Sequence, residues 1–166
     1  MKLGKEVTAQ EVLALKPYSI LVATGSNVIS IPLEGLDQVQ TVQAHDVLAN
    51  DMQFANKKVV VIGGGITGLE TALHINRQGT NQVSVVDMLP EWPVDMLDMR
   101  YQNEALLEVR HCNDQGVALF YNNKVVKFAD GKLFIESTKD GEVKELPADV
   151  IVLSVGVKPN DALWQE

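Results

Sequence analysis

The chain has few of the residues that mark several common classes of protein and site. Among its 166 residues there is one cysteine, Cys112, which excludes a disulfide within the chain and a cysteine-rich metal site. The longest apolar runs are only strand-sized, so the sequence predicts no transmembrane helix. The first residues, Met1–Glu6, lack the apolar run of a signal peptide, and we expect a reduced, cytoplasmic setting.

Positive charge is also scarce in this sequence. The 14 Lys and Arg are outnumbered by 22 Asp and Glu, which gives a net charge of −8 at pH 7. An acidic chain of this kind suits neither nucleic acid nor an anionic membrane, so we expect neither as a partner. His45, His74 and His111 stand apart from any Ser, Cys or carboxylate constellation. The sequence therefore predicts no catalytic residue and no metal ligand.

The most informative stretch that the sequence does contain begins with the apolar run Val59–Ile62. Four apolar residues between Lys58 and a glycine predict a short strand buried on both faces, as in parallel sheets. Gly63, Gly65 and Gly68 then fit the pattern G-x-G-x-x-G. In that pattern the first glycine permits a tight turn, the second lets a pyrophosphate approach the backbone, and the third permits close helix packing. The following helix would direct free N–H groups and a partial positive charge at the phosphates.

An acidic residue follows the next predicted strand, Val83–Val86. Asp87 comes 19 residues after Gly68, where a dinucleotide-binding fold places the acid that hydrogen-bonds an adenosine ribose. The alternative interpretation is a glycine-rich turn followed by a surface Asp at a strand end. Strand, turn, helix, strand and acid in this order favour the nucleotide site.

The charge of Asp87 also bears on which nucleotide binds. An NADPH site needs a cation near the 2′-phosphate, and the run Asp87–Glu91 contains none. Two unit charges about 5 Å apart interact by roughly 3 kcal/mol at an effective dielectric constant near 20. An ionised Asp87 would therefore disfavour NADPH by on the order of a hundredfold, and NADH is the predicted ligand.

The rest of the chain predicts an α/β protein with a parallel sheet and a small antiparallel β-meander. Apolar runs that suit buried strands occupy residues 18–26, 117–121 and 149–156. Asn-Asn and Asp-Gly turn signals separate three further strands, expected at residues 124–128, 133–138 and 143–146. Thr8 is a plausible N-cap, and helices are expected at residues 9–15, 44–48 and about 97–113. Cys112 falls on the apolar stripe of the last helix, which favours core filling over a nucleophile.

Two of these apolar runs share a plan. Residues 18–25 and 149–156 each combine a buried strand with small residues and a final glycine. If each closes one nucleotide-binding domain, residues 1–40 are the C-terminal part of an FAD- or ADP-type domain and residues 41–156 are an NAD(H)-binding domain. Residues 157–166 would then begin the return to the first domain. No glycine fingerprint precedes the first run, so we expect the chain to be a piece of a longer one.

Four segments together resemble a known family and occur in its order. They are Ile20–Ser26, Ala44–Leu48, Lys57–Ala72 and Ala148–Leu153. On these residues the chain resembles the nucleotide-binding region of the flavoproteins that carry two dinucleotide domains. It is most similar to the NADH:flavin oxidoreductases related to 2-enoate reductase, 2,4-dienoyl-CoA reductase and trimethylamine dehydrogenase. The resemblance implies a Rossmann-like, three-layer nucleotide-binding domain.

The resemblance also implies a set of cofactor-binding residues. Those expected at the NADH pyrophosphate are Gly63, Gly64, Gly65, Ile66, Thr67 and Gly68. Asp87 and Met88 would flank the adenosine ribose, and Val125 the adenine. Glu70 matches an acid near the nicotinamide amide, the alternative being a solvated residue in the first turn of the helix. Gly156 would face the nicotinamide half.

A second set of residues would face a nucleotide that another domain holds. In the family an Ala-Thr-Gly turn lies in the FAD or ADP domain, and the resemblance implies this position for Ala23, Thr24 and Gly25. The expected partners are therefore the FAD-type domain and the FMN barrel of the same polypeptide. Because an exposed apolar strand is prone to pairing, residues 20–23 are expected to dock on the NAD domain or to pair with a second chain in a homodimer.

The family reaction passes hydride from NADH to FAD, and electrons then pass through an iron–sulfur cluster and FMN to an acceptor. The resemblance implies that this chain contributes binding and orientation to a larger NADH-dependent flavin oxidoreductase. By itself it would bind NADH, without FAD, FMN or the cluster, and would be inactive. Two alternatives stay open, namely an ADP-binding module without turnover and an S-adenosylmethionine-binding domain.

Overall fold

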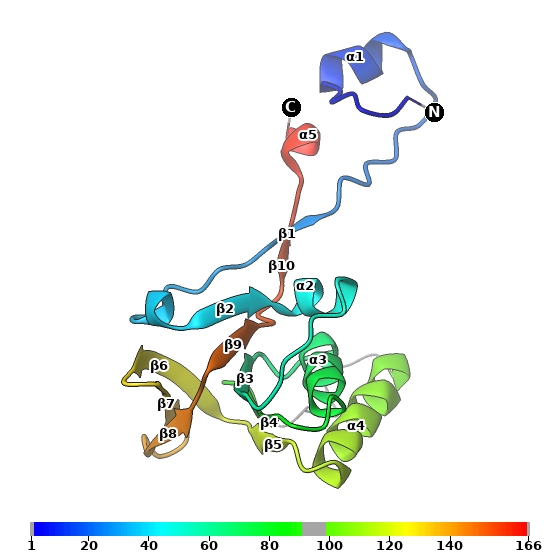
Figure 1. Ribbon diagram of the computed structural model, residues 1–166. Coiled ribbons are helices and arrows are strands. Elements are labelled where there is room, and N and C mark those ends of the chain that lie inside the picture. The colour runs from blue at the N-terminus through cyan, green and yellow to red at the C-terminus, as the bar shows by residue number, and fades with distance from the viewer. Residues whose placement is uncertain (1, 91–98, 166) are drawn as a thin grey trace. The chain divides into compact units, whose positions relative to one another are not determined.

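The computed structural model describes residues 2–90 and 99–165 (Figure 1). The chain divides into two compact units, one made of Met1–Ile29 with Gly156–Glu166 and the other of Ser30–Val155. The larger unit contains the glycine-rich turn, and it also includes residues 30–40. The smaller unit joins the two ends of the chain.

The larger unit is built around a parallel sheet of five strands. These strands are β2 (Gln40–Gln43), β3 (Lys58–Ile62), β4 (Gln82–Val86), β5 (Ala118–Phe120) and β9 (Val150–Leu153). Their order is β2-β9-β3-β4-β5, and each neighbouring pair is parallel. The strands predicted around Val59, Val83, Val117 and Val150 are therefore confirmed, with differences of a few residues at their ends.

The strand order changes direction at β3. On one side β3 pairs with β4, which follows it in the chain, and on the other side it pairs with β9. In open parallel sheets, ligands bind outside the carboxyl ends of the strands at a reversal of this kind. The topology alone therefore points to the residues that follow β3 and β9.

Alternate residues of β3 face two different layers. Val59 and Val61 belong to one apolar cluster, whereas Val60 and Ile62 belong to another. The first cluster joins the sheet to three helices, α2 (Ala44–Ala49), α3 (Ile66–Asn76) and α4 (Met99–Asp114). The second joins it to an antiparallel meander, β6 (Asn123–Ala129), β7 (Lys132–Ser137) and β8 (Val143–Pro147). Figure 1 shows these layers on opposite sides of the sheet, and the predicted Rossmann-like α/β fold is confirmed.

The helices of the larger unit agree with the sequence pattern where the structure describes them. Helix α2 matches the expected helix at 44–48, and a 3-10 helix, η1 (Leu36–Gln38), precedes β2. Helix α4 corresponds to the helix expected at about 97–113, although its predicted start at Leu97 lies outside the described residues. Within residues 2–90 and 99–165, no helix combines the length and the apolar character that are needed to cross a bilayer.

The smaller unit contains α1 (Ala9–Ala14), β1 (Ser26–Val28), β10 (Val157–Pro159) and α5 (Ala162–Gln165). The predicted N-cap at Thr8 is confirmed, because the Thr8 hydroxyl accepts the Glu11 backbone N–H at 3.3 Å. The Glu11 carboxylate in turn accepts the Thr8 N–H, which completes a capping box. Strands β1 and β10 pair in the antiparallel direction and so connect the two ends of the chain.

The strand predicted at residues 18–26 is wrong for most of its length. In this region only Ser26–Val28 is a strand, and residues 20–23 pair with no strand of the described chain. Leu21 is 95% exposed, and Ile20 and Val22 are exposed as well. An apolar run becomes a strand where a neighbouring strand supplies hydrogen-bond partners, and none of the described strands lies beside residues 20–23. If a homodimer formed through these residues, they would have to fold into a strand when the second chain bound.

Candidate functional site

The carboxyl ends of three neighbouring strands bring three backbone segments together. Gly63 follows β3, Asp87 follows β4 and Ser154 follows β9. The Gly63 N–H donates to the Val86 carbonyl at 2.8 Å, and the Ser154 N–H donates to the Ile62 carbonyl at 2.8 Å. The hydrogen bonding of the sheet therefore continues into the glycine-rich turn and determines where this turn lies.

Two of the glycines are required by the protein's own backbone. Gly63 has a φ of +107°, and a Cβ placed on it would lie 2.2 Å from the Ser154 carbonyl oxygen. A Cβ placed on Gly68 would lie 2.0 Å from the Gly63 carbonyl oxygen. Both distances are far inside van der Waals contact. Without a side chain, Gly63 admits the backbone that follows β9, and Gly68 lets helix α3 approach the turn.

Gly65 differs from these two because no described neighbour requires it to be glycine. Its φ is −69°, and a Cβ placed on it would meet no atom within 4 Å. Gly65 is also the N-cap residue of α3, and no side chain caps this helix. The first N–H groups of an α-helix lack intrahelical partners and carry the positive end of the helix dipole. The backbone in front of α3 is therefore open to an anion.

The Asp87 carboxylate lies directly beside this turn. Its Oδ2 accepts the Gly64 backbone N–H at 2.6 Å, and its Oδ1 accepts the Leu89 backbone N–H at 2.8 Å. The backbone of Asp87 is held on both sides, since its N–H donates to the Phe120 carbonyl at 3.0 Å and its carbonyl accepts the Asn123 N–H at 2.9 Å. The expected phosphate turn and the expected ribose-binding acid are thus in direct contact.

Two residues at this end of the sheet have no motif in the sequence that singles them out. A Cβ placed on Gly64 would lie 3.0 Å from Cε1 of Tyr121, so the tyrosine ring packs closely against the turn. The Ser154 hydroxyl oxygen would lie 3.3 Å from a Cβ on Gly68. Each residue directly follows a strand, β5 or β9, and the carboxyl ends of parallel strands meet at one end of a sheet. This rule is the signal that could have found both.

The other predicted residues of the larger unit vary in exposure. Ile66 and Thr67 open helix α3, half-buried and exposed respectively, and Glu70 is exposed on the same helix. Met88 is exposed just after Asp87. Val125 lies on β6 and packs, partly buried, against the meander-side apolar cluster. The roles expected for these residues at a nucleotide stay predictions.

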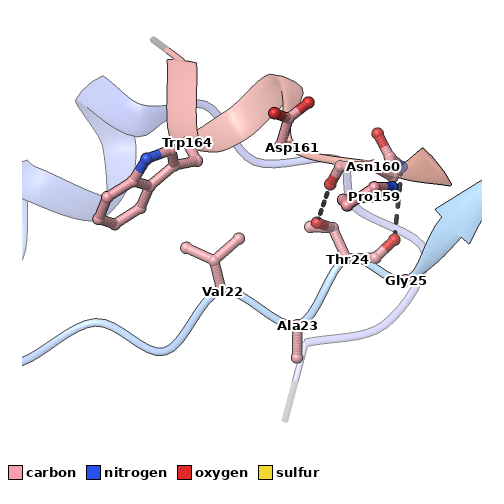
Figure 2. Close-up of a pocket in the computed structure, with 8 residues that line it drawn as sticks. All are labelled: Val22, Ala23, Thr24, Gly25, Pro159, Asn160, Asp161 and Trp164. Carbon is pink, nitrogen blue, oxygen red and sulfur yellow. Dashed lines mark hydrogen bonds between the residues drawn. The ribbon is translucent and has the colours of Figure 1, made fainter. Parts of the chain in front are cut away.

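The predicted Ala23-Thr24-Gly25 turn and Gly156 belong to the smaller unit. Figure 2 shows the turn beside Asn160, whose carbonyl accepts the Thr24 hydroxyl and whose N–H donates to the Gly25 carbonyl at 2.9 Å. An open pocket of about 340 Å³ lies here, lined by Val22, Ala23, Thr24, Gly25, Pro159, Asn160, Asp161 and Trp164. Gly156 precedes β10 with a φ of +91°. That these residues face nucleotides stays a prediction.

Cys112 lies in the core, and His74 and His111 each lie near a carboxylate. Cys112 is fully buried in the helix-side cluster, as expected for core filling, and burial raises the pKa of its thiol to about 11. Nε2 of His74 lies 3.3 Å from Oδ1 of Asp51, and Nδ1 of His111 lies 3.9 Å from Oε1 of Glu108. In the described part of the chain, no three His, Cys, Asp or Glu side chains are grouped so that they could hold a metal ion.

Known proteins resemble this chain over nearly its whole length. NADH oxidase of Thermoanaerobacter brockii is 36% identical over 164 residues, which cover 94% of this chain and 24% of that protein. Bilirubin reductase of Mediterraneibacter gnavus is 33% identical over 160 residues, which cover 96% of this chain and 24% of that protein. The chain thus spans about a quarter of the length of these curated relatives.

A solved structure and a family model agree with these relatives. The structure of a 2-naphthoyl-CoA reductase complex has a TM-score of 0.73 to this chain at 24% identity, and it covers 99% of this chain and 24% of that one. This similarity shows the fold. A family model described as pyridine nucleotide-disulphide oxidoreductase matches residues 2–166. The chain therefore belongs to the pyridine nucleotide-disulphide oxidoreductase family.

Proposed function

We propose that this chain is the NADH-binding part of a multidomain flavin-dependent oxidoreductase and that it presents NADH to an FAD held mainly by another domain. In this role the larger unit binds the diphosphate and the adenosine ribose. The Ala23-Thr24-Gly25 turn of the smaller unit would face the nucleotide of the FAD-type domain. When bound, FAD supplies the hydride acceptor, and the chain's own residues supply binding and orientation.

The open face of Gly65 is the observation that carries this proposal. Gly63 and Gly68 are explained by contacts within the protein, whereas Gly65 faces open space at an uncapped helix N-terminus. A diphosphate could approach the backbone there without meeting a side chain, and it would accept N–H groups from the positive end of α3. The Asp87 carboxylate lies at the same turn and could accept ribose hydroxyl groups.

Adding a methyl group at Gly65 tests whether a diphosphate approaches the backbone there. The variant Gly65→Ala should keep its fold, because its φ is ordinary and its Cβ meets no neighbour within 4 Å. The methyl group would stand where the diphosphate approaches, and we expect NADH affinity to fall at least about tenfold in a fluorescence titration. The control is Asn81→Ala at the opposite end of the sheet, which should leave NADH affinity unchanged. Unchanged NADH binding by Gly65→Ala would overturn the proposal.

A nucleotide-binding module without turnover is the second candidate, and one observation favours it. The residues that the structure brings together, the glycine turn and Asp87, would contact only the ADP half of NADH. Parallel titrations with NADH and ADP separate the candidates. Equal affinities would mean that the nicotinamide half makes no useful contact and would favour the ADP module. A thermal shift with S-adenosylmethionine but not with NADH would instead favour the S-adenosylmethionine-binding alternative.

Within the family we place the chain with the NADH:flavin oxidoreductases related to 2-enoate reductase. The similarity to an NADH oxidase and a bilirubin reductase supports this placement. The complete protein would then be cytoplasmic and would add an FMN barrel and an iron–sulfur cluster, whose ligands cannot come from a chain with one cysteine. The full translation of the parent gene tests this placement, since it should show a barrel pattern followed by a cysteine-rich stretch upstream. The isolated chain should purify colourless and without turnover, and a yellow preparation would contradict this.

A further inference from the structure

We infer that Asp87 is a positioning residue that holds the glycine turn in its binding shape before any nucleotide arrives. The role usually expected of an acid at this point is to bind ribose. Here the same carboxylate already accepts two backbone N–H groups from two different segments of the chain. What the turn binds rests on the proposed function, but the shape of the turn does not.

The Asp87 side chain hydrogen-bonds the backbone of two segments, the glycine turn after β3 and the segment after β4. Oδ2 of Asp87 accepts the N–H of Gly64, the middle residue of the Gly63–Gly65 turn, at 2.6 Å. Oδ1 accepts the Leu89 N–H at 2.8 Å, in the segment that follows β4. Short hydrogen bonds to a carboxylate are among the strongest that proteins make. The half-buried side chain thus links the turn after β3 to the segment after β4.

The space beside Gly64 is narrow. A Cβ on Gly64 would lie 3.0 Å from the Tyr121 ring and 3.2 Å from Cβ of Asp87. Gly64 thus lies close to both the Tyr121 ring and Asp87, and its N–H donates to the Asp87 carboxylate at 2.6 Å. If the carboxylate is removed, this N–H loses its acceptor at the base of the turn, whose next residue, Gly65, is where an anion would approach.

The positioning role predicts an effect of opposite sign from simple electrostatics. A carboxylate near an anion site repels the anion, so removing its charge should by itself strengthen anion binding. If the carboxylate instead holds the turn open and ordered, removing it should weaken anion binding. Inorganic pyrophosphate distinguishes the two, because it has no ribose for Asp87 to bind.

The test compares Asp87→Asn with Asp149→Asn in the full 166-residue chain. Asparagine has one acceptor oxygen and no charge, so it cannot hold the Gly64 and Leu89 N–H groups on two separate oxygens as the carboxylate does. Asp149 is the matched control, since its Oδ2 accepts the Lys58 N–H at 2.8 Å at the other end of β3. The readouts are the Gly64 amide resonance and its hydrogen exchange without ligand, followed by a pyrophosphate titration of the same samples.

We expect Asp87→Asn to speed exchange of the Gly64 amide at least about tenfold, and to lower pyrophosphate affinity at least about threefold, because charge-assisted bonds of this kind are strong. The Asp149→Asn variant should change neither. An unaltered Gly64 amide in Asp87→Asn, or tighter pyrophosphate binding, would overturn the inference.

If Asp87→Asn does not fold, a measurement on the unmodified chain tests the positioning role of Asp87. In the unmodified chain without ligand, the Gly64 amide should be protected from exchange, and an unprotected amide would overturn the inference. Because this readout involves no nucleotide, failure of the proposed function would appear separately, as an unmodified chain that does not bind NADH.

Discussion

The two ends of strand β3 satisfy their neighbouring backbone groups in different ways. At the amino end, four backbone N–H groups each donate to a side chain: Phe54 to Gln78 (2.8 Å), Asn56 to Thr80 (3.1 Å), Lys57 to Asn81 (3.0 Å) and Lys58 to Asp149 (2.8 Å). At the carboxyl end, Gly63 lies against the Ser154 carbonyl and Gly68 against the Gly63 carbonyl. The N-cap residue of α3 is Gly65, and no side chain caps this helix. Side chains accept the backbone N–H groups at one end, whereas at the other end α3 begins without a side-chain cap.

Under the proposed function, this difference would let one strand serve stability at one end and binding at the other. Side chains at the amino end fasten the segment that leads into β3, so the strand enters the sheet in a fixed register. At the carboxyl end a side chain that capped α3 would occupy the space that an anion needs. The Asp87 carboxylate bonds Gly64 from the side, and the face of Gly65 stays open.

The largest expected effect comes from adding a methyl group at the carboxyl end. In Gly63→Ala the new Cβ would lie 2.2 Å from the Ser154 carbonyl oxygen, and its φ of +107° is strained for any residue with a side chain. Overpacking and strain together should lower the free energy of unfolding by about 3 kcal/mol or more. Urea denaturation measures this loss, with Gly65→Ala as the control expected to cost less than about 1 kcal/mol. Equal losses in the two variants would contradict the distinction between these glycines.

An intermediate effect is expected from opening the amino end. Asn81 donates from Nδ2 to the carbonyls of Phe54 (2.9 Å) and Ile75 (3.3 Å), while its Oδ1 accepts from Lys57 (3.0 Å). Asn81→Ala should therefore lower the free energy of unfolding by about 2 kcal/mol. The matched control is Asn50→Ala, which removes an exposed side-chain bond to the Asp46 carbonyl and should cost about 0.5 kcal/mol. A fall in NADH affinity for Asn81→Ala would show that the two ends are not separate in function.

The smallest effect concerns which nucleotide is preferred. Asp87→Arg replaces a repelling charge with an attracting one near the expected 2′-phosphate, so the ratio of NADPH to NADH affinity should rise at least about tenfold. Affinity for both nucleotides should fall, because the Gly64 N–H loses its carboxylate acceptor. Titrations with the two nucleotides measure the ratio. An unchanged ratio would remove Asp87 from the ribose site, and unchanged affinities would argue against its positioning role.

Much of the larger unit could be predicted because its rules are local. The apolar run Val59–Ile62 and the following glycines predicted strand, turn and helix in the right places, and Asp87 followed the next strand as expected. Asn81 in contrast belongs to no sequence motif, and only the structure shows that its side chain bonds three backbone groups. Two of its partners, Lys57 and Phe54, lie 24 and 27 residues away in the chain, so no local pattern could reveal them.

The strand expected at residues 20–23 is the clearest example of what a sequence pattern leaves open. Its apolar residues match those of β9, yet β9 lies between β2 and β3 while residues 20–23 have no neighbouring strand among those described. A strand depends on hydrogen bonds from another part of the chain, and composition alone cannot supply them.

The amino-acid order was enough to locate the glycines, the acid and the strands around them, because spacing and alternation act over a few residues. Tertiary structure decided which glycine must be glycine to avoid a backbone clash and which faces open space. Strand β9 brings the Ser154 carbonyl from a distant part of the chain, so that a Cβ on Gly63 would lie 2.2 Å from its oxygen. A Cβ on Gly65 would meet no atom within 4 Å. The same holds for the Asp87 carboxylate, whose contact with Gly64 exists because two parallel strands end side by side.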